Sequence, residues 1–390
     1  MESKVIVGVV SLLLLLLVVF VPTPTLAAVN VVAFGAKPDG RTDATKAFLR
    51  AWNVVCHSPK SITFYIPKGR YLLRSIMFKG PCRNKINFWN SGTLVARLSY
   101  PKNEKTWIEF NRVHGLRIRG GHIDGRGRAL WACKRAGRSC PFGPPSLTIG
   151  VSKNIKIVGL NSIHSKFFHL FIYRSQKVEV LGGTLIAPSL SPNTDGIHVQ
   201  HSMDVKIIGT NIRSGDDCVS IGPGTRKVLI HGVFCGPGHG ISIGSLGHKL
   251  NEKGVQDVTI RKVTFRGTDN GLRIKTWGRP SRGYVKKVVF EDSKMINVRY
   301  PIIINQNYCP TKKGCPNKHS GVQISDLKIQ RIVGTSKTKV AAVFDCSASN
   351  PCSGIRMGNV VLTYNRGPTL SSCKNVRGYT FGRNTIRNCF

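Results

Sequence analysis

The sequence predicts an all-β protein that folds as a parallel β-helix, a solenoid in which each coil of the chain stacks on the coil before it. Strand-like segments recur along the chain, and few stretches have the apolar spacing of an α-helix. The most regular segment begins at Asp195, Asp217, His239, Asn270 and Tyr300, so the repeats are 22, 22, 31 and 30 residues long. Unequal repeats of a few tens of residues, separated by Gly and Asn turns, are typical of solenoids.

A second strand-like segment recurs in the same way and supports the same fold. It begins at Lys177, Asp204, Lys227, Asp257 and Lys287, and the second and fourth residues of every copy are apolar. In a parallel β-helix, equivalent positions of successive coils lie about 4.8 Å apart. Residues that are far apart in the chain are therefore expected to meet on one surface.

The chain begins with the pattern of a secretory leader. Residues 5–21 are almost all apolar, follow Lys4 and precede several small residues. This predicts a signal peptide over residues 1–27 that is cleaved, with the β-helix domain over residues 28–390. An uncleaved anchor helix is the alternative, although the run is short for a membrane span. After cleavage we expect no membrane association and an extracellular location.

One helix is expected near the start of the mature chain. Thr42 or Asp43 can cap its N-terminus, and Ala47, Phe48 and Trp52 give it an apolar side. We expect this short helix to cover the N-terminal end of the solenoid, where core residues and strand edges would otherwise be exposed.

Twelve cysteines in a secreted chain predict disulfide bonds. The sequence does not establish the pairing, but taken in order the cysteines form six close pairs: Cys56/Cys82, Cys133/Cys140, Cys218/Cys235, Cys309/Cys315, Cys346/Cys352 and Cys373/Cys389. Zinc is the competing interpretation, and no paired C-x-x-C spacing supports it.

The charge of the chain is strongly positive. Lys and Arg number 58 and Asp and Glu number 18, which gives a formal net charge of +40. Such a charge favours a polyanionic partner. Nucleic acid is not expected, because the leader directs the chain out of the cell and no zinc finger, RNA-binding aromatic motif or basic heptad is present. An acidic polysaccharide fits both the charge and the compartment, and the alternative is that much of the charge is simply solvated surface.

Polar residues occupy equivalent places in the aligned repeats. Asp195, Asp217 and His239 begin three successive copies, and Asp216 lies beside them. Stacking predicts that these side chains form one column. Arg273 and Lys275 follow on one face of a later strand and belong to the same surface.

This combination suits the hydrolysis of a glycosidic bond. An inverting glycosidase needs a carboxylic acid that protonates the leaving oxygen and a carboxylate base that activates water, about 6.5–9.5 Å apart. Crowded carboxylates should raise at least one pKa, as the acid requires. Arg273 and Lys275 could hold the carboxylate of an acidic sugar. The segment over residues 126–145, with Cys133, Cys140 and several basic residues, is expected to be a surface loop beside the cleft.

Simpler interpretations exist for each residue alone. An Asp before Gly, such as Asp195, is most often a turn residue. Asp216 and Asp217 could also form a turn, or hold a metal ion together with His239. The joint placement of the residues in one register favours a catalytic centre without a metal.

Four motifs resemble those of the polygalacturonases, the pectin-cleaving glycoside hydrolases, and most nearly the plant members. They are N-T-D from Asn193, G-D-D from Gly215, G-H-G from Gly238 and R-I-K from Arg273. The resemblance implies a right-handed parallel β-helix and inverting hydrolysis of α-1,4-linked galacturonate without metal or cofactor. It also implies pectin or polygalacturonate as the partner and the cell wall as the location. We expect a monomer, and endo action by default, although the sequence does not decide between endo and exo.

The resemblance also implies a role for each site residue. Asp216 matches the proton donor, Asp195 and Asp217 match the pair that activates water, and His239 matches the histidine that supports the acid. The expected substrate-binding residues are Asn193, Arg273, Lys275 and Tyr308.

Two other functions compete with this hypothesis. The first is a protein that binds pectin through charge without cutting it, for which the aspartates would not be needed. The second is another β-helix enzyme, either a rhamnogalacturonan hydrolase or a pectate lyase that uses calcium. The N-T-D and R-I-K motifs favour a hydrolase of homogalacturonan over both enzymes.

Overall fold

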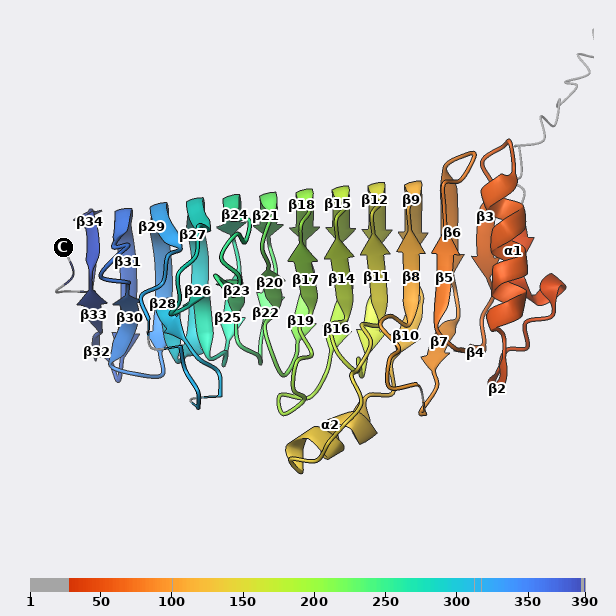
Figure 1. Ribbon diagram of the computed structural model, residues 1–390, viewed down its shortest axis with the longest axis horizontal. Coiled ribbons are helices and arrows are strands. Elements are labelled where there is room, and N and C mark those ends of the chain that lie inside the picture. The colour runs from red at the N-terminus through yellow and green to blue at the C-terminus, as the bar shows by residue number, and fades with distance from the viewer. Residues whose placement is uncertain (1–27, 100, 312, 317, 387–388, 390) are drawn as a thin grey trace, which may run out of the picture.

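The computed structural model describes residues 28–386 and 389, apart from residues 100, 312 and 317, so the expected leader over residues 1–27 lies outside the described residues. The described chain forms one row of coils that stack along the long axis (Figure 1). Within this part of the chain, all strand pairings are parallel except that of β31 with β32. The parallel β-helix predicted from the sequence is confirmed.

One wall of the coils is a sheet of eleven described strands that contains the first recurring segment. In order along the axis, these strands are β5 (Ile76–Lys79), β8 (Ile108–Asn111), β11 (Leu147–Gly150), β14 (Leu170–Tyr173), β17 (Ile197–Gln200), β20 (Val219–Ile221), β23 (Ile241–Leu246), β26 (Asn270–Trp277), β28 (Tyr300–Tyr308), β30 (Val340–Asp345) and β33 (Leu370–Lys374).

The other walls belong to a second sheet of 23 described strands. Its first ladder contains the second recurring segment and consists of β1 (Ala28–Asn30), β3 (Thr63–Ile66), β6 (Ile86–Asn90), β9 (His114–Arg119), β12 (Lys153–Val158), β15 (Gln176–Leu181), β18 (Met203–Ile208), β21 (Arg226–His231), β24 (Val255–Arg261), β27 (Tyr284–Val298), β29 (Gln323–Ser336), β31 (Cys352–Tyr364) and β34 (Val376–Phe381). Its second ladder consists of β2 (Asp39–Asp43), β4 (Arg70–Leu73), β7 (Thr93–Ala96), β10 (His122–Asp124), β13 (Asn161–Ile163), β16 (Thr184–Ile186), β19 (Asn211–Arg213), β22 (Phe234–Cys235) and β25 (Thr264–Arg266), and β25 pairs with the long strand β27. The short strand β32 (Gly367–Pro368) pairs with the end of β31.

The strand register is the one that the repeats predict. In the first segment, the residues that pair in succession are Ile197, Val219, Ile241, Leu272 and Ile302. In the second segment, they are Val178, Val205, Val228, Val258 and Val288. Each of these ten side chains is at most 2% exposed, so the matching apolar positions form the core. Burial of matching residues in every coil is what holds the coils in register.

A left-handed residue near the start of successive strands repeats with the coils. The residues in this conformation are Asn154, Lys177, Asp204, Lys227, Asp257, Lys287 and Asp326, with φ between 54° and 59°. Asn and Asp adopt this conformation more readily than most residues. Because the same backbone bend recurs, the coils remain superimposable.

The predicted N-terminal helix is α1 (Thr45–His57), which lies at the N-terminal end of the stack (Figure 1). The N-cap position is held by Ala44, so neither Thr42 nor Asp43 is the cap, but the Asp43 carboxylate accepts a hydrogen bond from the Thr45 N–H at 3.0 Å. Phe48 and Trp52 are buried against aromatic rings of the first coils. The 3-10 helix η1 (Val31–Phe34) precedes α1.

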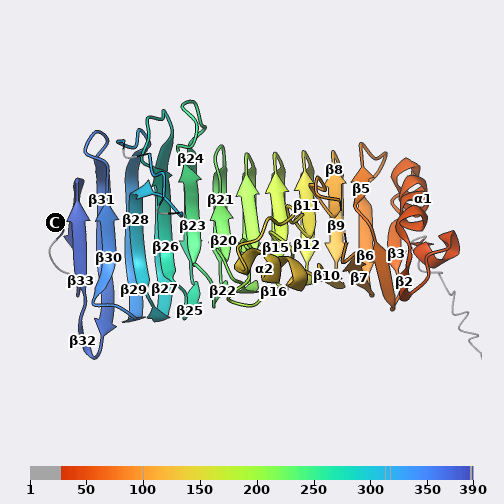
Figure 2. The same ribbon diagram turned by 60° about the horizontal axis from the view of Figure 1, so that its bottom comes forward.

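A second helix, α2 (Arg128–Arg135), lies in the insert that the sequence analysis interpreted as a loop. It lies below the row of coils in Figure 1 and in front of them in Figure 2, where the bottom of the molecule is turned forward. The helix has only two buried residues, Leu130 and Trp131, which is too few to produce a periodic sequence signal. The Trp131 indole N–H donates to the Ser165 carbonyl at 3.1 Å, so contact with the coils stabilises this short helix.

All six predicted disulfide pairs are present. Cys218 and Cys235 are fully buried, and they link the residue just before β20 to β22. None of the described helices is long and apolar enough to span a membrane.

Candidate active site

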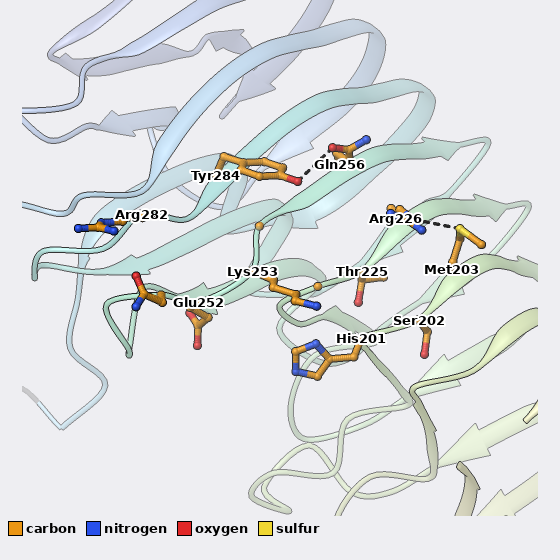
Figure 3. Close-up of a pocket in the computed structure, with 13 residues that line it drawn as sticks. His201, Ser202, Met203, Thr225, Arg226, Glu252, Lys253, Gln256, Arg282 and Tyr284 are labelled. Carbon is orange, nitrogen blue, oxygen red and sulfur yellow. Dashed lines mark hydrogen bonds between the residues drawn. The ribbon is translucent and has the colours of Figure 1, made fainter. Parts of the chain in front are cut away.

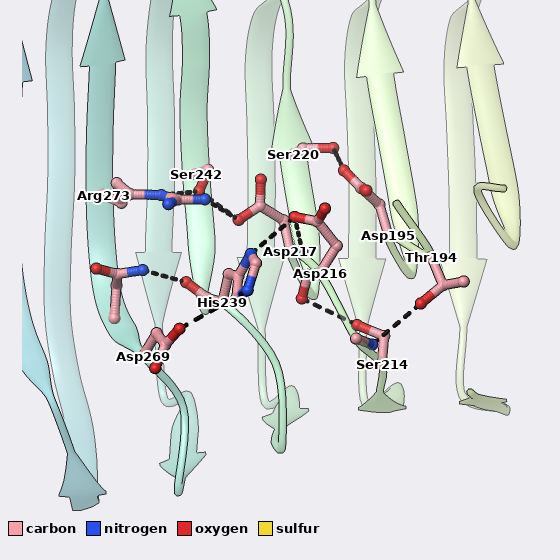
Figure 4. A network of polar contacts seen from close by, with 12 residues as sticks. Thr194, Asp195, Ser214, Asp216, Asp217, Ser220, His239, Ser242, Asp269 and Arg273 are labelled. Atoms are coloured by element: carbon pink, nitrogen blue, oxygen red, sulfur yellow. Dashed lines mark hydrogen bonds and ion pairs between the residues drawn. The ribbon is translucent and has the colours of Figure 1, made fainter. Parts of the chain in front are cut away.

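The four predicted catalytic residues lie together at one end of three neighbouring strands (Figure 4). Asp195 precedes β17, Asp216 and Asp217 precede β20, and His239 precedes β23. Backbone hydrogen bonds continue the strand register through these residues, since the Gly196 N–H donates to the Asp217 carbonyl at 2.9 Å. The superimposed coils therefore bring together residues that are up to 44 positions apart.

Asp217 is the buried anion of the site. Its side chain is 2% exposed, and Arg273 Nη2 and Lys275 Nζ contact its two oxygens at 2.7 and 2.8 Å. The Ser242 hydroxyl also donates to it at 2.6 Å. Burial alone would raise the pKa of Asp217, but the two cations and these hydrogen bonds hold it well below its usual range. Asp217 is therefore a carboxylate at any ordinary pH.

Asp195 lies one coil away and has the opposite character. Burial, followed by the neighbouring charges of Asp216 and Asp217, raises the pKa of Asp195 well above its usual range. The Ser220 hydroxyl donates to its carboxyl at 2.6 Å. The raised carboxyl pKa that we expected from crowding therefore lies on Asp195, whereas the resemblance assigns the proton donor to Asp216.

His198 is a residue of this network that the sequence analysis did not select. Its Nδ1 lies 2.7 Å from the Ser220 oxygen, and burial lowers the pKa of His198 to about 4, so the ring is neutral near pH 7. Because Ser220 gives its one hydrogen to Asp195, Nδ1 of His198 must be the donor in this pair. The register could have indicated His198, since it pairs with Ser220 in the next coil.

Asp216 is the most accessible of the three carboxyls, with a side chain that is 19% exposed. His239 Nδ1 lies 2.9 Å from its Oδ1, and the Asp217 N–H donates to the same oxygen at 2.8 Å. Burial would lower the pKa of His239, but its hydrogen bond to Asp216 and the charges of both aspartates raise it. His239 beside Asp216 therefore holds its imidazole proton to a higher pH than a free histidine would.

Asp269 also contacts this pair and was missing from the sequence analysis. Its Oδ2 lies 3.7 Å from His239 Nε2, and its side chain is 56% exposed. The aligned repeats could have indicated Asp269, because it precedes Asn270 in the same way that Asp216 precedes Asp217.

The structure divides the predicted substrate-binding residues into two groups. Tyr308 lies beside the cationic pair, with Lys275 Nζ 5.4 Å from the centre of its ring. We expected Arg273 and Lys275 to be available for a sugar carboxylate, but both form ion pairs with Asp217. Arg273 nevertheless has an Nη1 group with no hydrogen-bond partner among the described residues, so it retains donors for a ligand.

Asn193 is exposed and lies next to the insert instead. Lys134 of α2 places its Nζ 3.4 Å from the Asn193 Oδ1 and 5.8 Å from the centre of the Phe167 ring. Burial lowers the pKa of Lys134, and the charge of Asp216 partly opposes this effect. The insert thus adds a cation on the Asp216 side, and nothing in its sequence distinguishes Lys134 from the other basic residues.

Three of these residues also lie close enough together to be compared with a metal site. Asp216, Asp217 and His239 can bring one ligand atom each within 4.8 Å of one another. Both Asp217 oxygens, however, already contact a positively charged group, and the Nδ1 of His239 contacts Asp216. This donor set is engaged internally and does not favour a cation.

A separate hollow of about 490 Å³ lies at the turns that follow β17, β20 and β23, at the opposite end of these strands (Figure 3). Its lining includes His201, Arg226, Lys253 and Arg282 and a single carboxylate, Glu252. Glu252 accepts hydrogen bonds from two backbone N–H groups of its own loop. The hollow is therefore positively charged, and its described lining has no pair of carboxyls for acid–base chemistry.

Comparison with known proteins identifies the family. Residues 56–385 match the model of the glycosyl hydrolases family 28. The chain belongs to this family. Residues 28–80 of this family 28 glycoside hydrolase also match a model described as rhamnogalacturonase A/epimerase, pectate lyase-like.

Plant members of family 28 are similar to the chain over most of its length. It is 51% identical over 357 residues to a polygalacturonase of Prunus persica, and the match covers 90% of the chain and 91% of that protein. It is 40% identical over 369 residues to an exopolygalacturonase of Arabidopsis thaliana, with coverage of 92% and 82%. Among solved structures, an endo-xylogalacturonan hydrolase from Aspergillus tubingensis has a TM-score of 0.76 at 22% identity. The match covers 92% of the chain and 100% of that structure, which shows a shared fold.

Proposed function

We propose that this family 28 protein is a polygalacturonase that hydrolyses the α-1,4-galacturonosidic bonds of homogalacturonan with inversion. One observation carries the proposal: the site holds a carboxylate fixed in its ionised form next to groups whose pKa values are raised. Asp217 is that carboxylate, while burial raises the pKa of the Asp195 carboxyl and the contact with Asp216 raises the pKa of the His239 imidazole. A glycosidase needs both states at the same pH. The polygalacturonase of Prunus persica, at 51% identity, supports the choice of substrate.

In this mechanism Asp216 donates the proton to the glycosidic oxygen. It is the carboxyl that solvent and a substrate reach most easily, and the Nδ1 of His239 lies within hydrogen-bond distance of it. As the bond between C1 and the leaving oxygen breaks, the proton passes from the Asp216–His239 pair to that oxygen. The raised pKa of His239 keeps this proton available.

Asp217 acts as the general base. A water molecule attacks C1 from the face opposite Asp216 and gives its proton to the Asp217 carboxylate. Asp195, held by Ser220, positions the same water from the neighbouring coil. The reaction uses one water and yields two shorter chains, one of which ends in a new reducing sugar.

The spacing of the carboxyls bears on the stereochemistry. The nearest oxygens of Asp216 and Asp217 lie within 4.8 Å, which by itself would suit a retaining pair at roughly 5–5.5 Å. Both oxygens of Asp217, however, are bound by Arg273 and Lys275, which fixes the carboxylate in place and makes it a weak nucleophile. A water molecule can approach the sugar carbon while Asp217 keeps both contacts, so base catalysis through water is favoured and inversion is expected.

The cations of the site suit a galacturonate chain. Arg273 and Lys275, with Tyr308 beside them, can bind the carboxylate of the sugar on one side of the cleaved bond. On the other side, Lys134 and Asn193 can bind the next sugar. Arg273 retains an unpartnered Nη1 among the described residues, as this requires.

The proposed setting is the cell wall. Six disulfide bonds favour an oxidising, extracytoplasmic compartment, which agrees with a leader over residues 1–27 and a secreted domain over residues 28–390. The net charge of +40 favours retention on acidic pectin, and we propose that the protein acts there as a monomer.

The test is incubation of the purified protein with polygalacturonate. New reducing ends should form, and the matched Asp216→Asn variant should form almost none. The absence of new reducing ends with the wild-type protein, or equal activity of the variant, would overturn the proposal. Unsaturated products that absorb ultraviolet light would instead identify a lyase. The size of the first products distinguishes endo from exo action.

A further inference from the structure

Trp89 of β6 is exposed although tryptophan is rarely left in solvent. More than half of its surface, 52%, is exposed, whereas Trp52, Trp107 and Trp131 are each at most 4% exposed. Its indole packs edge-on against Tyr65 of β3, with ring centres 5.4 Å apart. Exposed aromatic residues that gather on one face often mark a binding site.

Two arginines of the next strand extend this aromatic pair. Arg119 of β9 pairs in register with Trp89, and Arg117 pairs with Asn87. Residues two apart on a strand share a face, so both arginines point outward with Trp89. Both are exposed, and neither guanidinium forms an ion pair or hydrogen bond with another residue in the part of the chain that the structure describes.

These side chains line a hollow of about 640 Å³ on the outer wall of the solenoid. The described residues around it include two arginines and no acidic residue. The hollow belongs to the sheet of 23 strands, whereas the catalytic carboxyls precede strands of the other sheet. It is therefore separate from the active site.

We propose that this surface, formed by Tyr65, Trp89, Arg117 and Arg119, is a second, non-catalytic site for an acidic polysaccharide. The identity of that polysaccharide as galacturonan rests on the function proposed above. Tyr65, Trp89 and Arg119 lie on three successive coils about 4.8 Å apart, which is comparable to the length of one pyranose residue along a glycan. A chain that runs along the axis can place the apolar faces of two sugars on the aromatic rings and a carboxylate on an arginine.

The charge of the surface selects the occupant. A neutral glycan would use the aromatic pair and leave two unpaired guanidinium groups beside it. A galacturonan chain supplies carboxylates that these groups bind by two parallel hydrogen bonds. A second site on the same polymer would hold the enzyme near its substrate and increase its retention without new contacts in the active site.

The test measures retention in gels that contain polygalacturonate, with all variants in the Asp216→Asn background so that the polymer is not cut. The double variant Arg117→Gln/Arg119→Gln should lose retention by about threefold or more, because two exposed charge contacts are removed. Trp89→Ala should lose retention to a similar extent. A thermal unfolding curve checks that each variant is folded. If Trp89→Ala does not fold, the double arginine variant alone decides the outcome.

The matched control is Arg261→Gln/Lys262→Gln, which removes the same charge from two exposed positions at the end of β24 and in the bend that follows it. It should retain most of the binding. Equal losses in the control and in the arginine pair would show that only net charge matters, and unchanged retention in the arginine pair would also overturn the proposal. A loss with Trp89→Ala alone would point to a neutral glycan and refute the acidic occupant.

Turnover of trigalacturonate separates this inference from the proposed function. In the background with Asp216 intact, the arginine pair should leave the hydrolysis of this short substrate unchanged. If the wild-type protein does not hydrolyse it, the proposed function fails, while the retention measurement still decides whether the second site exists. A fall in trigalacturonate hydrolysis in a folded arginine variant would place the surface within the active site and overturn the proposal.

Discussion

Ser242→Ala and Ser220→Ala should separate the roles of the two buried aspartates. The two serines are register partners on β23 and β20, and each donates a hydrogen bond of 2.6 Å to a buried carboxyl. Ser242 donates to Asp217, which is ionised, and Ser220 donates to Asp195, which retains a proton. The same substitution at equivalent positions of neighbouring coils therefore tests two different protonation states.

Ser242→Ala removes a hydrogen bond to a charged acceptor, which contributes about 1.5–3 kcal/mol. Since 1.36 kcal/mol corresponds to one pH unit, the acidic limb of the activity profile should move toward neutral pH by about one unit or more. A carboxyl with a depressed pKa stabilises the fold above its unfolded-state pKa and loses this contribution as the pH falls. The variant should therefore be destabilised most above about pH 5 and approach the wild type in strong acid.

Ser220→Ala should behave differently. The pKa of Asp195 is raised, so its contribution to stability is greatest at low pH and is lost as the pH rises through the folded-state pKa. The bond from Ser220 lowers this pKa, and its removal leaves the proton more firmly on Asp195. The acidic limb of the activity should stay in place, while stability near neutral pH falls because His198 also loses its partner.

The assay is kcat/KM on polygalacturonate across the acidic range, together with urea unfolding at each pH. If Ser220→Ala moves the acidic limb and Ser242→Ala does not, the general base is Asp195 and the assignment to Asp217 is wrong. If neither variant moves it, the acidic limb does not report on these carboxyls.

Three further results are expected. Lys134→Met should lower kcat/KM on polygalacturonate by about tenfold, because one charged contact with the substrate is lost. Arg135→Met on the same helix should have little effect, and equal effects of the two variants would indicate a structural role for α2. Replacement of Cys218 and Cys235 by Ala should lower the free energy of unfolding by about 3 kcal/mol, given a loop of 17 residues, and a chemical unfolding curve that matches the wild type would contradict this. Proton NMR of the first products should show the β-anomer at the new reducing end, and an initial α-anomer would refute attack by water on the opposite face.

Much of the fold could be predicted because the determinants repeat. The apolar positions of the two segments recur in every coil, and a slip by one residue would turn each of these side chains out of the core. The register of Ile197 with Val219 and of Val178 with Val205 follows directly from that constraint. The residues that precede the strands, among them Asp195 and Asp217, are then brought together without any further assumption.

The parts that escaped prediction depend on contacts that do not repeat. The helix α2 occurs once, and the position of Lys134 depends on how Trp131 packs against the coils. The partners of Asp217 depend on side-chain conformation, because Arg273 and Lys275 could equally have pointed to solvent. Neither kind of contact produces a period in the sequence, so only the structure reveals it.

The buried cation pair explains how three carboxyls can lie within two coils. Unpaired, they would repel one another, and burial would drive all of them to the neutral form. Arg273 and Lys275 remove that repulsion at one position, since both contact Asp217. Asp195, one coil further from them, has no ion pair with any described residue, and burial raises its pKa. Contact with the two cations thus keeps Asp217 ionised, whereas the buried Asp195 without such a contact favours its neutral form. A charge-neutral replacement at position 275 should accordingly disturb the base more than the acid.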